Sequence, residues 1–523
     1  MINLTLTTLA TACNGQLVCQ QALKAISVEN LVTDSRALKA KEEQVPGHLA
    51  FLALKGPNFD GHRFAKQVVA QGCQVLIVDH LIADLEQANV AQIVVEDTRI
   101  ALGQIAAYVK QQVAPKTVGI TGSSGKTTVK EMLAAILSRL GKVLATQGNF
   151  NNDIGVPLTL LRLEHAHDFA VIEMGANHIG EIAYTTALVK PDVAMINNIA
   201  AAHLEGFGDL CGVARAKGEI FAGLSAEGVA LYNKDTKYTS KWQWRLTDKQ
   251  VRTFSCLNPI NADCYSSNVV LDENGCAQFE LQTSIGHCNI MLTVPGKHNV
   301  CNAVAAATAA IECGASLQDI QLGLAQMTPV KGRLNIHHLP QTTTCAAIKL
   351  IDDTYNANVE SIKAAISLLA NYNGQRILVL GDMGELGCEA RRYHQEIGEF
   401  AKEQGIEVLL TLGVLSQSTS DAFAQNNDAI SEHFSERNLL EETLFELLSH
   451  KDQIIKEKLN ANNSEHDSTT ERNKVAQVQI LVKGSRSAHM EYVVEGLVNW
   501  HARQPKNQLV NPANNSVNKQ EKA

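Results

Sequence analysis

Short apolar runs alternate with amphipathic stretches along the central part of the chain, residues 116–330. The runs at 169–172 and 192–197 have the continuous apolar character of buried strands. Stretches with apolar residues at three- and four-residue spacing lie between such runs, and this alternation predicts a largely parallel sheet with crossover helices. Residues 250–294 have more of the alternating pattern of half-buried strands. The pattern therefore predicts a central α/β domain.

Two further α/β regions flank this domain. Residues 1–115 mix short strands and helices and are predicted to form a small N-terminal domain, with Pro115 at the junction. Residues 331–503 are predicted to form a doubly wound, Rossmann-like domain. Its expected strands are 347–351, 376–380, 407–412 and 478–482, and its expected helices lie near 359–370, 389–404, 438–450 and 488–500.

Two polar segments lack this periodicity. Residues 458–475 cannot bury enough apolar surface to offset the entropy lost on ordering, so they predict a mobile surface loop. Residues 504–523 are similar and predict a disordered tail.

One stretch, residues 116–141, has the pattern strand, glycine turn, helix. Apolar residues from Val129 to Leu140 recur at helical spacing and predict one buried face, with Gly141 as the helix stop. Glycines in the turn allow backbone N–H groups to approach a phosphate, and the helix N-terminus adds its positive dipole end. The candidate nucleotide-binding residues are Gly122, Ser123, Ser124, Gly125, Lys126, Thr127 and Thr128.

Within this turn, Lys126 is suited to reach terminal phosphates and Thr127 to ligate a nucleotide's Mg²⁺. The usual nucleotide-loop spacing places a glycine at position 120, where this chain has Ile120, so the turn is a shorter TGxxGKTT variant. The alternative is a plain glycine turn that caps a core helix. The Gly-Lys-Thr-Thr at the helix entry favours phosphate binding.

Composition excludes several classes of protein. The 523 residues are 45% hydrophobic and 19% charged, with a formal net charge of −9 and no basic run typical of a nucleic-acid surface. No apolar stretch is long enough to span a bilayer, and no basic region precedes the first apolar residues, so we expect a cytoplasmic protein. The twelve cysteines include no C-x-x-C pair and are expected to be reduced core residues.

Three polar residues after the phosphate loop are weak signals when taken singly. Glu173 ends a predicted strand and is also suited to cap a helix, His203 fits a core histidine, and Lys217 fits a solvated helix position. Open parallel sheets gather ligands at the carboxyl ends of their strands, where Thr127, Glu173 and His203 are expected to converge. A phosphate-loop motor or regulator is the alternative class, but it predicts an acidic pair at a strand end and a basic track, and the sequence shows neither.

The motifs together resemble the Mur ligase family over nearly the whole chain. They are TDSR at 33–36, FDGH at 59–62, TGSSGKTT at 121–128, GNFNNDIGVPLTLL at 148–161, EMGANHIGEI at 173–182, HLEGFG at 203–208, KGEIF at 217–221, GKHNVCNAVAA at 296–306, GRL at 332–334, DDTYNANVES at 352–361, LGDMGELG at 380–387 and LVKGSRSAHME at 481–491. Val359 departs from the pattern, since many relatives have proline there.

The resemblance implies ATP-dependent amide formation in peptidoglycan precursor synthesis, in which D-alanyl-D-alanine is joined to a UDP-N-acetylmuramoyl tripeptide. It leaves open whether the third residue of the tripeptide is diaminopimelate or lysine. The Asp-Asn-Pro-Arg motif of the diaminopimelate-adding relatives is absent. A folylpolyglutamate synthase-like ligase, which shares the central domain, is the second candidate, and the N-terminal UDP-type segment argues against it.

The resemblance also implies roles for individual residues. Two Mg²⁺ sites are implied at Thr127, Glu173, His203 and a carbamylated Lys217, with Lys126, Glu173, His203 and Lys217 as catalytic residues. Nucleotide contacts beyond the loop are implied for Asn299, Asn302, Arg333, Asp353, Tyr355 and Asn356. Substrate contacts are implied for Ser35, Arg36, Asp60, Gly61, His62, Lys483, Ser485 and Arg486. A monomer without nucleic-acid partners is expected.

Overall fold

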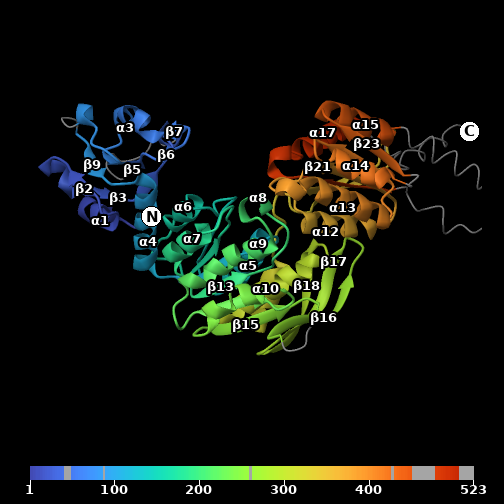
Figure 1. The fold of residues 1–523 in the computed structure, drawn as a ribbon, viewed down its shortest axis with the longest axis horizontal. Coiled ribbons are helices and arrows are strands. Elements are labelled where there is room, and N and C mark those ends of the chain that lie inside the picture. Colours follow the sequence, from blue (N-terminus) through green and yellow to red (C-terminus); the bar gives the residue numbers. More distant parts are fainter. Residues whose placement is uncertain (40–48, 86–88, 258–261, 426–428, 450–476, 506–523) are drawn as a thin grey trace, which may run out of the picture. The chain divides into compact units, whose positions relative to one another are not determined.

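The computed structural model describes residues 1–39, 49–85, 89–257, 262–425, 429–449 and 477–505 (Figure 1). These residues fall into two compact units, one made of residues 1–272 with 276–328 and the other of residues 329–523 with 273–275. Both units contain helices and strands, so the predicted α/β fold class is confirmed. The domain limits at residues 115, 330 and 503 remain predictions.

The N-terminal part of the first unit contains a small sheet. Its strand order is β2 (Gln16–Val18), β9 (Ala91–Val94), β8 (Val75–Val78), β5 (Leu49–Leu52) and β4 (Asn30–Val32). Neighbouring strands are parallel except for the β2–β9 pair. The other elements here are β1 (Leu4–Thr5), α1 (Leu6–Ala12), η1 (Gln21–Ala25), β3 (Ser27–Val28), α2 (Arg36–Lys39), β6 (Lys55–Gly56), β7 (Phe59–Asp60), η2 (Gly61–Phe64), α3 (Ala65–Ala70), η3 (Ala83–Leu85) and α4 (Thr98–Val113).

The central part of the first unit contains a larger sheet (Figure 1). Its strand order is β11 (Val143–Ala145), β12 (Phe169–Glu173), β10 (Lys116–Thr121), β13 (Val193–Ile196), β14 (Val229–Asn233), β15 (Gln250–Ser255), β16 (Cys264–Leu271), β17 (Cys276–Thr283) and β18 (Gly286–Pro295). The strands from β11 to β16 are parallel, and β16, β17 and β18 pair antiparallel. The predicted parallel sheet and the alternating segment at 250–294 are both confirmed.

Helices connect these strands and complete the core. They are α5 (Lys126–Leu137), α6 (Gly155–Leu160), α7 (Glu181–Val189), α8 (Leu204–Phe207), α9 (Leu210–Gly218), η4 (Glu219–Gly223), η5 (Thr239–Lys241), η6 (Gln243–Leu246), α10 (His298–Glu312) and α11 (Leu317–Ala325). Helix α10 packs against α5, and this contact places residues of α10 next to the glycine turn, from which they are far in sequence. Helix α4 packs against α6 and α7.

The helix after the glycine turn is shorter than its periodicity predicts. Helix α5 ends at Leu137, and Leu140 is 37% exposed, so the prediction that Leu140 extends the buried face is wrong. The glycine at 141 meets a different need: a Cβ there would lie 2.4 Å from an oxygen of Asp168. That carboxylate accepts the N–H of Lys142 at 2.8 Å and ties the start of β11 to the start of β12.

The expectation of reduced cysteines is also wrong at one place. Cys256, just after β15, forms a disulfide with Cys301 in the first turn of α10. The two Cα atoms lie 5.3 Å apart across a sequence separation of 45 residues. Sequence spacing gave no sign of this pair, because their proximity depends on how α10 packs beside β15.

The second unit is built on one sheet. Its strand order is β19 (Asn335–Leu339), β20 (Ala347–Asp353), β24 (Gln477–Lys483), β21 (Gln375–Gly381), β22 (Val408–Leu412) and β23 (Ile430–Phe434). Every neighbouring pair is parallel except β19–β20. The other elements are α12 (Val359–Ala370), η7 (Gly387–Glu389), α13 (Ala390–Glu403), α14 (Gln417–Ala424), α15 (Arg437–Ser449), η8 (Arg486–Ala488) and α17 (Glu491–Ala502).

The predicted strands and helices of this unit are confirmed to within a few residues. Val359 is the first residue of α12, behind an Asn358 cap that bonds reciprocally with Ser361. The first helical position needs no backbone N–H, so it accepts valine or proline equally well. The predicted loop at 458–475 and most of the predicted tail, residues 506–523, lie outside the described residues.

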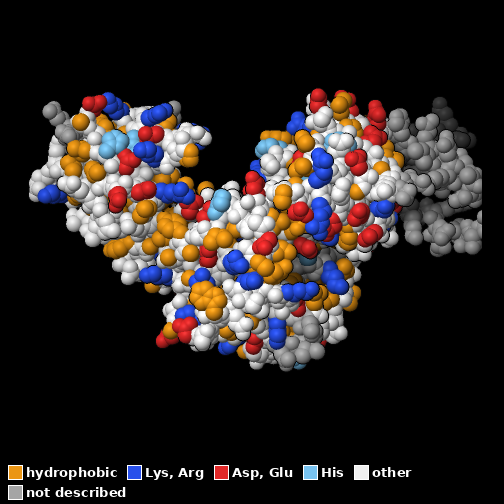
Figure 2. Space-filling model, viewed as in Figure 1, with side chains coloured by type: hydrophobic (Ala, Val, Ile, Leu, Met, Phe, Trp, Pro, Cys, Tyr) orange, Lys and Arg blue, Asp and Glu red, His pale blue; other side chains and the backbone are white. Residues whose placement is uncertain are grey.

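Two surface properties accompany this fold. On the face drawn in Figure 2, acidic and basic side chains are interspersed over both units. Among the helices that the structure describes, none combines the length and apolarity needed to cross a bilayer.

Candidate active site

The glycine turn between β10 and α5 is shaped by two glycines with positive φ. Gly122 has φ +157° and Gly125 has φ +73°. A Cβ on Gly125 would lie 2.4 Å from Oδ1 of Asn302 and 2.7 Å from Nδ2 of Asn197. Position 125 therefore excludes a side chain both by its backbone conformation and by the close approach of two asparagines.

A chain of buried amides supports this turn from behind. Asn197 Nδ2 donates to the carbonyl of Ser124 at 3.0 Å and to Oδ1 of Asn302 at 3.2 Å. Asn302 Nδ2 donates to Oδ1 of Asn299 at 2.8 Å, and Asn299 Nδ2 donates to the carbonyl of Pro295. Both residues predicted to contact the nucleotide from α10 are thus 4–5% exposed and linked to the turn.

Asn198, which sequence reasoning missed, forms hydrogen bonds with two serines of the turn. Its Oδ1 accepts the backbone N–H of Ser123 at 3.0 Å and of Ser124 at 2.9 Å, and its Nδ2 donates to Oγ of Ser124 at 2.8 Å. These N–H groups are among those predicted to face a phosphate. The available signal was position: Asn198 follows β13, directly beside β10 in the sheet.

The predicted meeting of Thr127 and Glu173 is confirmed. Oγ1 of Thr127, in the first turn of α5, donates to Oε2 of Glu173 at 2.9 Å. The other oxygen of Glu173 accepts Nδ2 of Asn151 at 2.8 Å, and its backbone N–H donates to Thr146. Glu173 is 2% exposed, and its hydroxyl and amide partners hold the carboxylate in one orientation. Asn151 and Thr146 are further residues that sequence reasoning missed.

Lys217 is fully buried near the phosphate-loop lysine. Burial holds the pKa of the Lys217 ammonium well below its ordinary 10.5, and the charge of Lys126 lowers this pKa further. Nζ of Lys217 lies 5.8 Å from the centroid of the Phe207 ring. The ring of His203 meets the Phe207 ring edge-on, with the two centroids 6.3 Å apart. Lys126 itself donates to the carbonyl of Gly122 at 2.8 Å. The structure therefore places His203 and Lys217 around the same aromatic ring.

In the second unit, five predicted residues form one cluster at the carboxyl ends of β20 and β24. Lys483 donates to Oδ2 of Asp353 at 2.5 Å and to the carbonyl of Asn356 at 2.9 Å. The guanidinium of Arg333 lies 4.3 Å from the ring centroid of Tyr355. Burial raises the pKa of Asp353, while the charges of Lys483 and Arg333 lower it. Lys483, predicted for the peptide, thus pairs with a residue predicted for the nucleotide.

The other two predicted peptide-binding residues follow β24. The N–H of Ser485 donates to the carbonyl of Asp382 at 3.0 Å, and its hydroxyl lies 3.1 Å from that of Ser487. Arg486 is 63% exposed and pairs with Glu491 at 3.0 Å. A long, exposed cation of this kind is available to an anionic ligand.

The residues predicted for the UDP-sugar form two groups. Arg36, next to Ser35, makes a forked contact with Asp34, whose pKa is lowered to about 2 chiefly by this hydrogen bond. Gly61 lies where a Cβ would meet the carbonyl of Leu54 at 2.9 Å.

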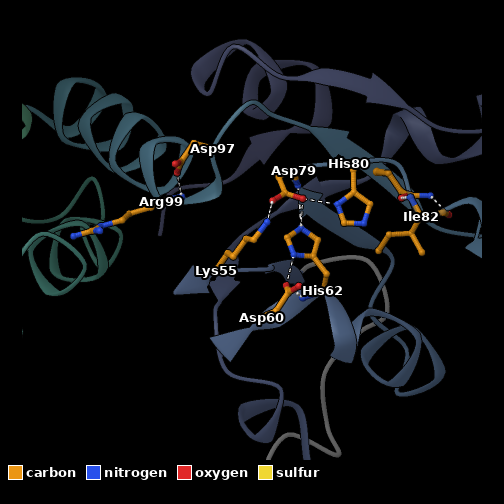
Figure 3. Close-up of polar contacts among 9 residues, drawn as sticks. Lys55, Asp60, His62, Asp79, His80, Ile82, Asp97 and Arg99 are labelled. Atoms are coloured by element: carbon orange, nitrogen blue, oxygen red, sulfur yellow. Dashed lines mark hydrogen bonds and ion pairs between the residues drawn. The ribbon is translucent and has the colours of Figure 1, made fainter. Parts of the chain in front are cut away.

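The second group surrounds His62 (Figure 3). Its Nδ1 lies 2.7 Å from Asp60 Oδ1 and its Nε2 accepts the N–H of Asp79 at 3.0 Å. His62 is therefore braced between two elements, the β7–η2 turn and the end of β8.

Comparison with known proteins places these motifs in one family. Residues 29–110 match the Mur ligase family catalytic domain, residues 120–310 the Mur ligase middle domain and residues 332–468 the Mur ligase glutamate ligase domain. A relative named UDP-N-acetylmuramoyl-tripeptide–D-alanyl-D-alanine ligase from Escherichia coli (strain K12) is 44% identical over 95% of this chain and 99% of its own length. The enzyme of that name from Haemophilus influenzae is 40% identical over the same shares.

Solved structures agree with this match. A crystal structure of MurF from Acinetobacter baumannii has a TM-score of 0.80 and 37% identity over 95% of this chain and 99% of that one. MurF from Thermotoga maritima, at 23% identity and a TM-score of 0.73, shares the fold. The chain belongs to the Mur ligase family.

Proposed function

We propose that this protein joins D-alanyl-D-alanine to UDP-N-acetylmuramoyl-tripeptide with hydrolysis of ATP to ADP and phosphate, a step of peptidoglycan precursor synthesis. Relatives of that name that are 40–44% identical over nearly the full length support the substrates. The structural observation that carries the reaction type is the Thr127–Glu173 contact at the mouth of a phosphate loop. A hydroxyl and a buried carboxylate at this place are hard oxygen donors of the kind that Mg²⁺ prefers.

The chemistry explains why a nucleotide is needed. A carboxylate is unreactive toward an amine because its oxygen is a poor leaving group. Transfer of the γ-phosphoryl group to the tripeptide's terminal carboxylate releases ADP and gives an acyl phosphate. The amine of D-alanyl-D-alanine then attacks the carbonyl carbon, phosphate leaves with its oxygen, and an amide forms. The enzyme's part is chiefly to position anions and stabilise their charge.

Residues of the loop serve that purpose. Lys126 would hold the β- and γ-phosphates together with the loop N–H groups, and Thr127 and Glu173 would hold a first Mg²⁺. Mg²⁺ supplies positive charge that offsets repulsion between the nucleotide and the carboxylate. The remaining loop residues, with Asn299 and Asn302 behind them, keep the turn in shape.

Lys217 would complete a second Mg²⁺ site with His203 as a carbamate. An ammonium offers no lone pair to a cation, but burial favours the neutral amine here. A neutral amine attacks CO₂, a nitrogen–carbon bond forms, one proton leaves, and the product is an anion with two oxygens. The depressed pKa of Lys217 supports this proposal because it increases the share of the amine in its reactive, neutral form.

The second unit and the N-terminal part would supply the remaining contacts. Arg333, Asp353, Tyr355 and Asn356 are proposed for the nucleotide, and Lys483, Ser485 and Arg486 for peptide carboxylates. Ser35, Arg36, Asp60, Gly61 and His62 are proposed for the UDP-sugar. We further propose that the protein is cytoplasmic, because ATP and nucleotide sugars are cytoplasmic metabolites. We also propose that it is a monomer, which light scattering tests.

Phosphate release tests the function. Purified protein with ATP and Mg²⁺ should release phosphate in step with amide formation only when both the UDP-muramoyl tripeptide and D-alanyl-D-alanine are present. Comparing tripeptides that carry diaminopimelate or lysine identifies the preferred acceptor. Lys126→Ala should abolish turnover, whereas Lys142→Ala, which alters a half-exposed surface lysine, should not. Phosphate release that does not depend on the UDP-muramoyl tripeptide or on D-alanyl-D-alanine would contradict the proposal. Wild-type turnover in Lys126→Ala would contradict it as well.

A further inference from the structure

A buried lysine on α5 has no role in the reaction proposed above. Lys130 lies one helical turn after Lys126, and its side chain is 1% exposed. Its Nζ donates to the carbonyl of Thr146 at 2.5 Å and lies 2.7 Å from Oε1 of the neighbouring Glu131. Removing an ammonium from water is costly, and an apolar side chain of similar length would fill the same space without that cost.

The carbonyl that Lys130 holds lies at the end of a strand pair. Strands β11 and β12 are parallel with Ala145 opposite Val171, and the N–H of Thr146 donates to the carbonyl of Val171 at 3.1 Å. In a parallel ladder the N–H and C=O of one residue point to the same neighbouring strand, where they bond residues two positions apart. The next bond of this ladder would therefore run from the N–H of Glu173 to the carbonyl of Thr146.

Two other hydrogen bonds take the place of that one. The N–H of Glu173 donates to Oγ1 of Thr146 at 3.0 Å, and the Thr146 carbonyl accepts Nζ of Lys130. Thr146 is 1% exposed and Glu173 2%, so water does not compete for these groups. The lysine therefore occupies the acceptor that the strand would otherwise offer to Glu173, and the threonine hydroxyl replaces that acceptor.

We propose that Lys130 is a positioning residue for Glu173. Its ammonium draws the Thr146 carbonyl away from the ladder, and the Thr146 hydroxyl then fixes the backbone of Glu173. From this backbone the carboxylate reaches Oγ1 of Thr127 at 2.9 Å. Without the ammonium, the carbonyl becomes available to the N–H of Glu173, and the carboxylate moves relative to Thr127.

The role of Lys130 rests on the proposed function of Glu173 as a Mg²⁺ ligand. Groups that orient a metal ligand without touching the metal change metal affinity about 10–100-fold when they are removed. The contacts of Lys130 with Thr146 and Glu131 lie outside the glycine turn, residues 121–128. Loss of its ammonium should therefore weaken metal binding while leaving the affinity for metal-free nucleotide as it is.

Metal binding to the full-length protein saturated with ADP tests this role. Mn²⁺ stands in for Mg²⁺, because both metals suit carboxylate and water ligands, and water-proton relaxation reports bound Mn²⁺ without turnover. Lys130→Met removes the ammonium but keeps a long side chain, and it should weaken Mn²⁺ binding about 10-fold. The affinity for ADP measured in the presence of EDTA should not change.

Changes at Thr146 test the second step. Thr146→Val removes the hydroxyl and should weaken Mn²⁺ binding to a similar extent, whereas Thr146→Ser should bind as the wild type does. Adding Lys130→Met to Thr146→Val should cost little more, because both changes act through one contact. The matched control is Glu131→Gln, which alters the other partner of Lys130, a 38% exposed side chain, and should leave Mn²⁺ binding unchanged.

Two results would overturn the positioning role alone. One is wild-type Mn²⁺ affinity in a folded Lys130→Met protein, or in Thr146→Val if the first variant does not fold. The other is an equal loss of affinity for Mn²⁺ and for metal-free ADP, which would indicate general damage to the site. By contrast, Mn²⁺ binding that Glu173→Gln leaves intact would refute Glu173 as a metal ligand, and the proposed metal site would fall with it.

Discussion

The hydroxyl of Thr127 donates to a carboxylate oxygen of Glu173 across 2.9 Å, joining the first turn of α5 to the end of β12. These residues are 46 positions apart in sequence and meet because β10 and β12 are parallel neighbours, with Ile120 opposite Glu173. The sheet register therefore sets the spacing of two proposed Mg²⁺ ligands before any ligand arrives.

Removing the hydroxyl tests this pairing. Thr127→Val keeps the shape of the side chain but removes one proposed metal ligand and the partner of Glu173. We expect the Mg²⁺ concentration for half-maximal activity to rise about 10–100-fold, by analogy with the loss of a single supporting contact at a metal site. Thr127→Ser should restore most of it. A Thr127→Val enzyme with an unchanged Mg²⁺ requirement would remove Thr127 from the metal site.

Carbamylation of Lys217 has a direct spectroscopic test. Protein equilibrated with ¹³C-labelled CO₂ should show one carbamate carbon resonance that disappears in Lys217→Ala. That variant should be nearly inactive and partly rescued by acetate, whose oxygens replace those of the carbamate, but not by a small amine. Rescue by the amine alone, with no carbamate resonance, would indicate an unmodified lysine.

Burial of Lys217 also predicts a pH dependence of stability in CO₂-free buffer. Its folded pKa lies well below the ordinary 10.5, so the unfolded chain binds more protons between these two values. The free energy of unfolding should therefore rise with pH across that window. Lys217→Met removes the buried amine and should flatten the rise, as measured by urea unfolding at a series of pH values. Parallel profiles for both proteins would contradict the assigned pKa shift.

The Asp353–Lys483 pair should be strongly coupled, because the Lys483 side chain is 2% exposed and that of Asp353 13%. Lys483→Met leaves a buried carboxylate without its partner and should cost about 3–5 kcal/mol of unfolding free energy. Adding Asp353→Leu should recover much of this loss. The double-mutant cycle measures the coupling, and simple additivity of the two changes would show that the pair does not interact.

The disulfide closes a separation of 45 residues between Cys256 and Cys301. Peptide mapping without reductant should recover the linked peptides. Reduction, or Cys301→Ala, should lower the unfolding free energy by about 2–4 kcal/mol, since the unfolded chain loses a constraint. Cys211→Ala, at a free and half-buried cysteine, is the matched control. Equal unfolding with and without reductant would argue against the bond in solution.

Apolar patterning predicted the central strands and the amphipathic helices of the second unit. The helix expected at 359–370 occurs at those residues, and the strand expected at 478–482 spans Gln477–Lys483. The sheet-edge strands β19 and β23 were missed. Strand β23, Ile430–Phe434, has a single neighbour and exposes much of its polar sequence, so it carries little apolar signal.

The candidate site was predictable only in part. Lys126, Thr127 and Glu173 lie at strand and helix ends, where open parallel sheets gather ligands, and together they indicated a site that Glu173 alone did not. Asn197 and Asn198 were missed because an amide that supports a loop resembles any other amide in sequence. Their role depends on β13 lying next to β10, a tertiary relationship that the local pattern does not contain.

The tight approach of Asn302 to Gly125 couples the tolerance of these two positions to substitution. Any side chain at 125 would overlap Oδ1 of Asn302, and loss of the Asn302 amide would leave Asn197 with one partner fewer. Position 125 is therefore closed to side chains on two grounds, its positive φ and the Asn302 amide, and shortening Asn302 removes only the second. A mutational scan should score Gly125 as intolerant even in an Asn302→Ala background.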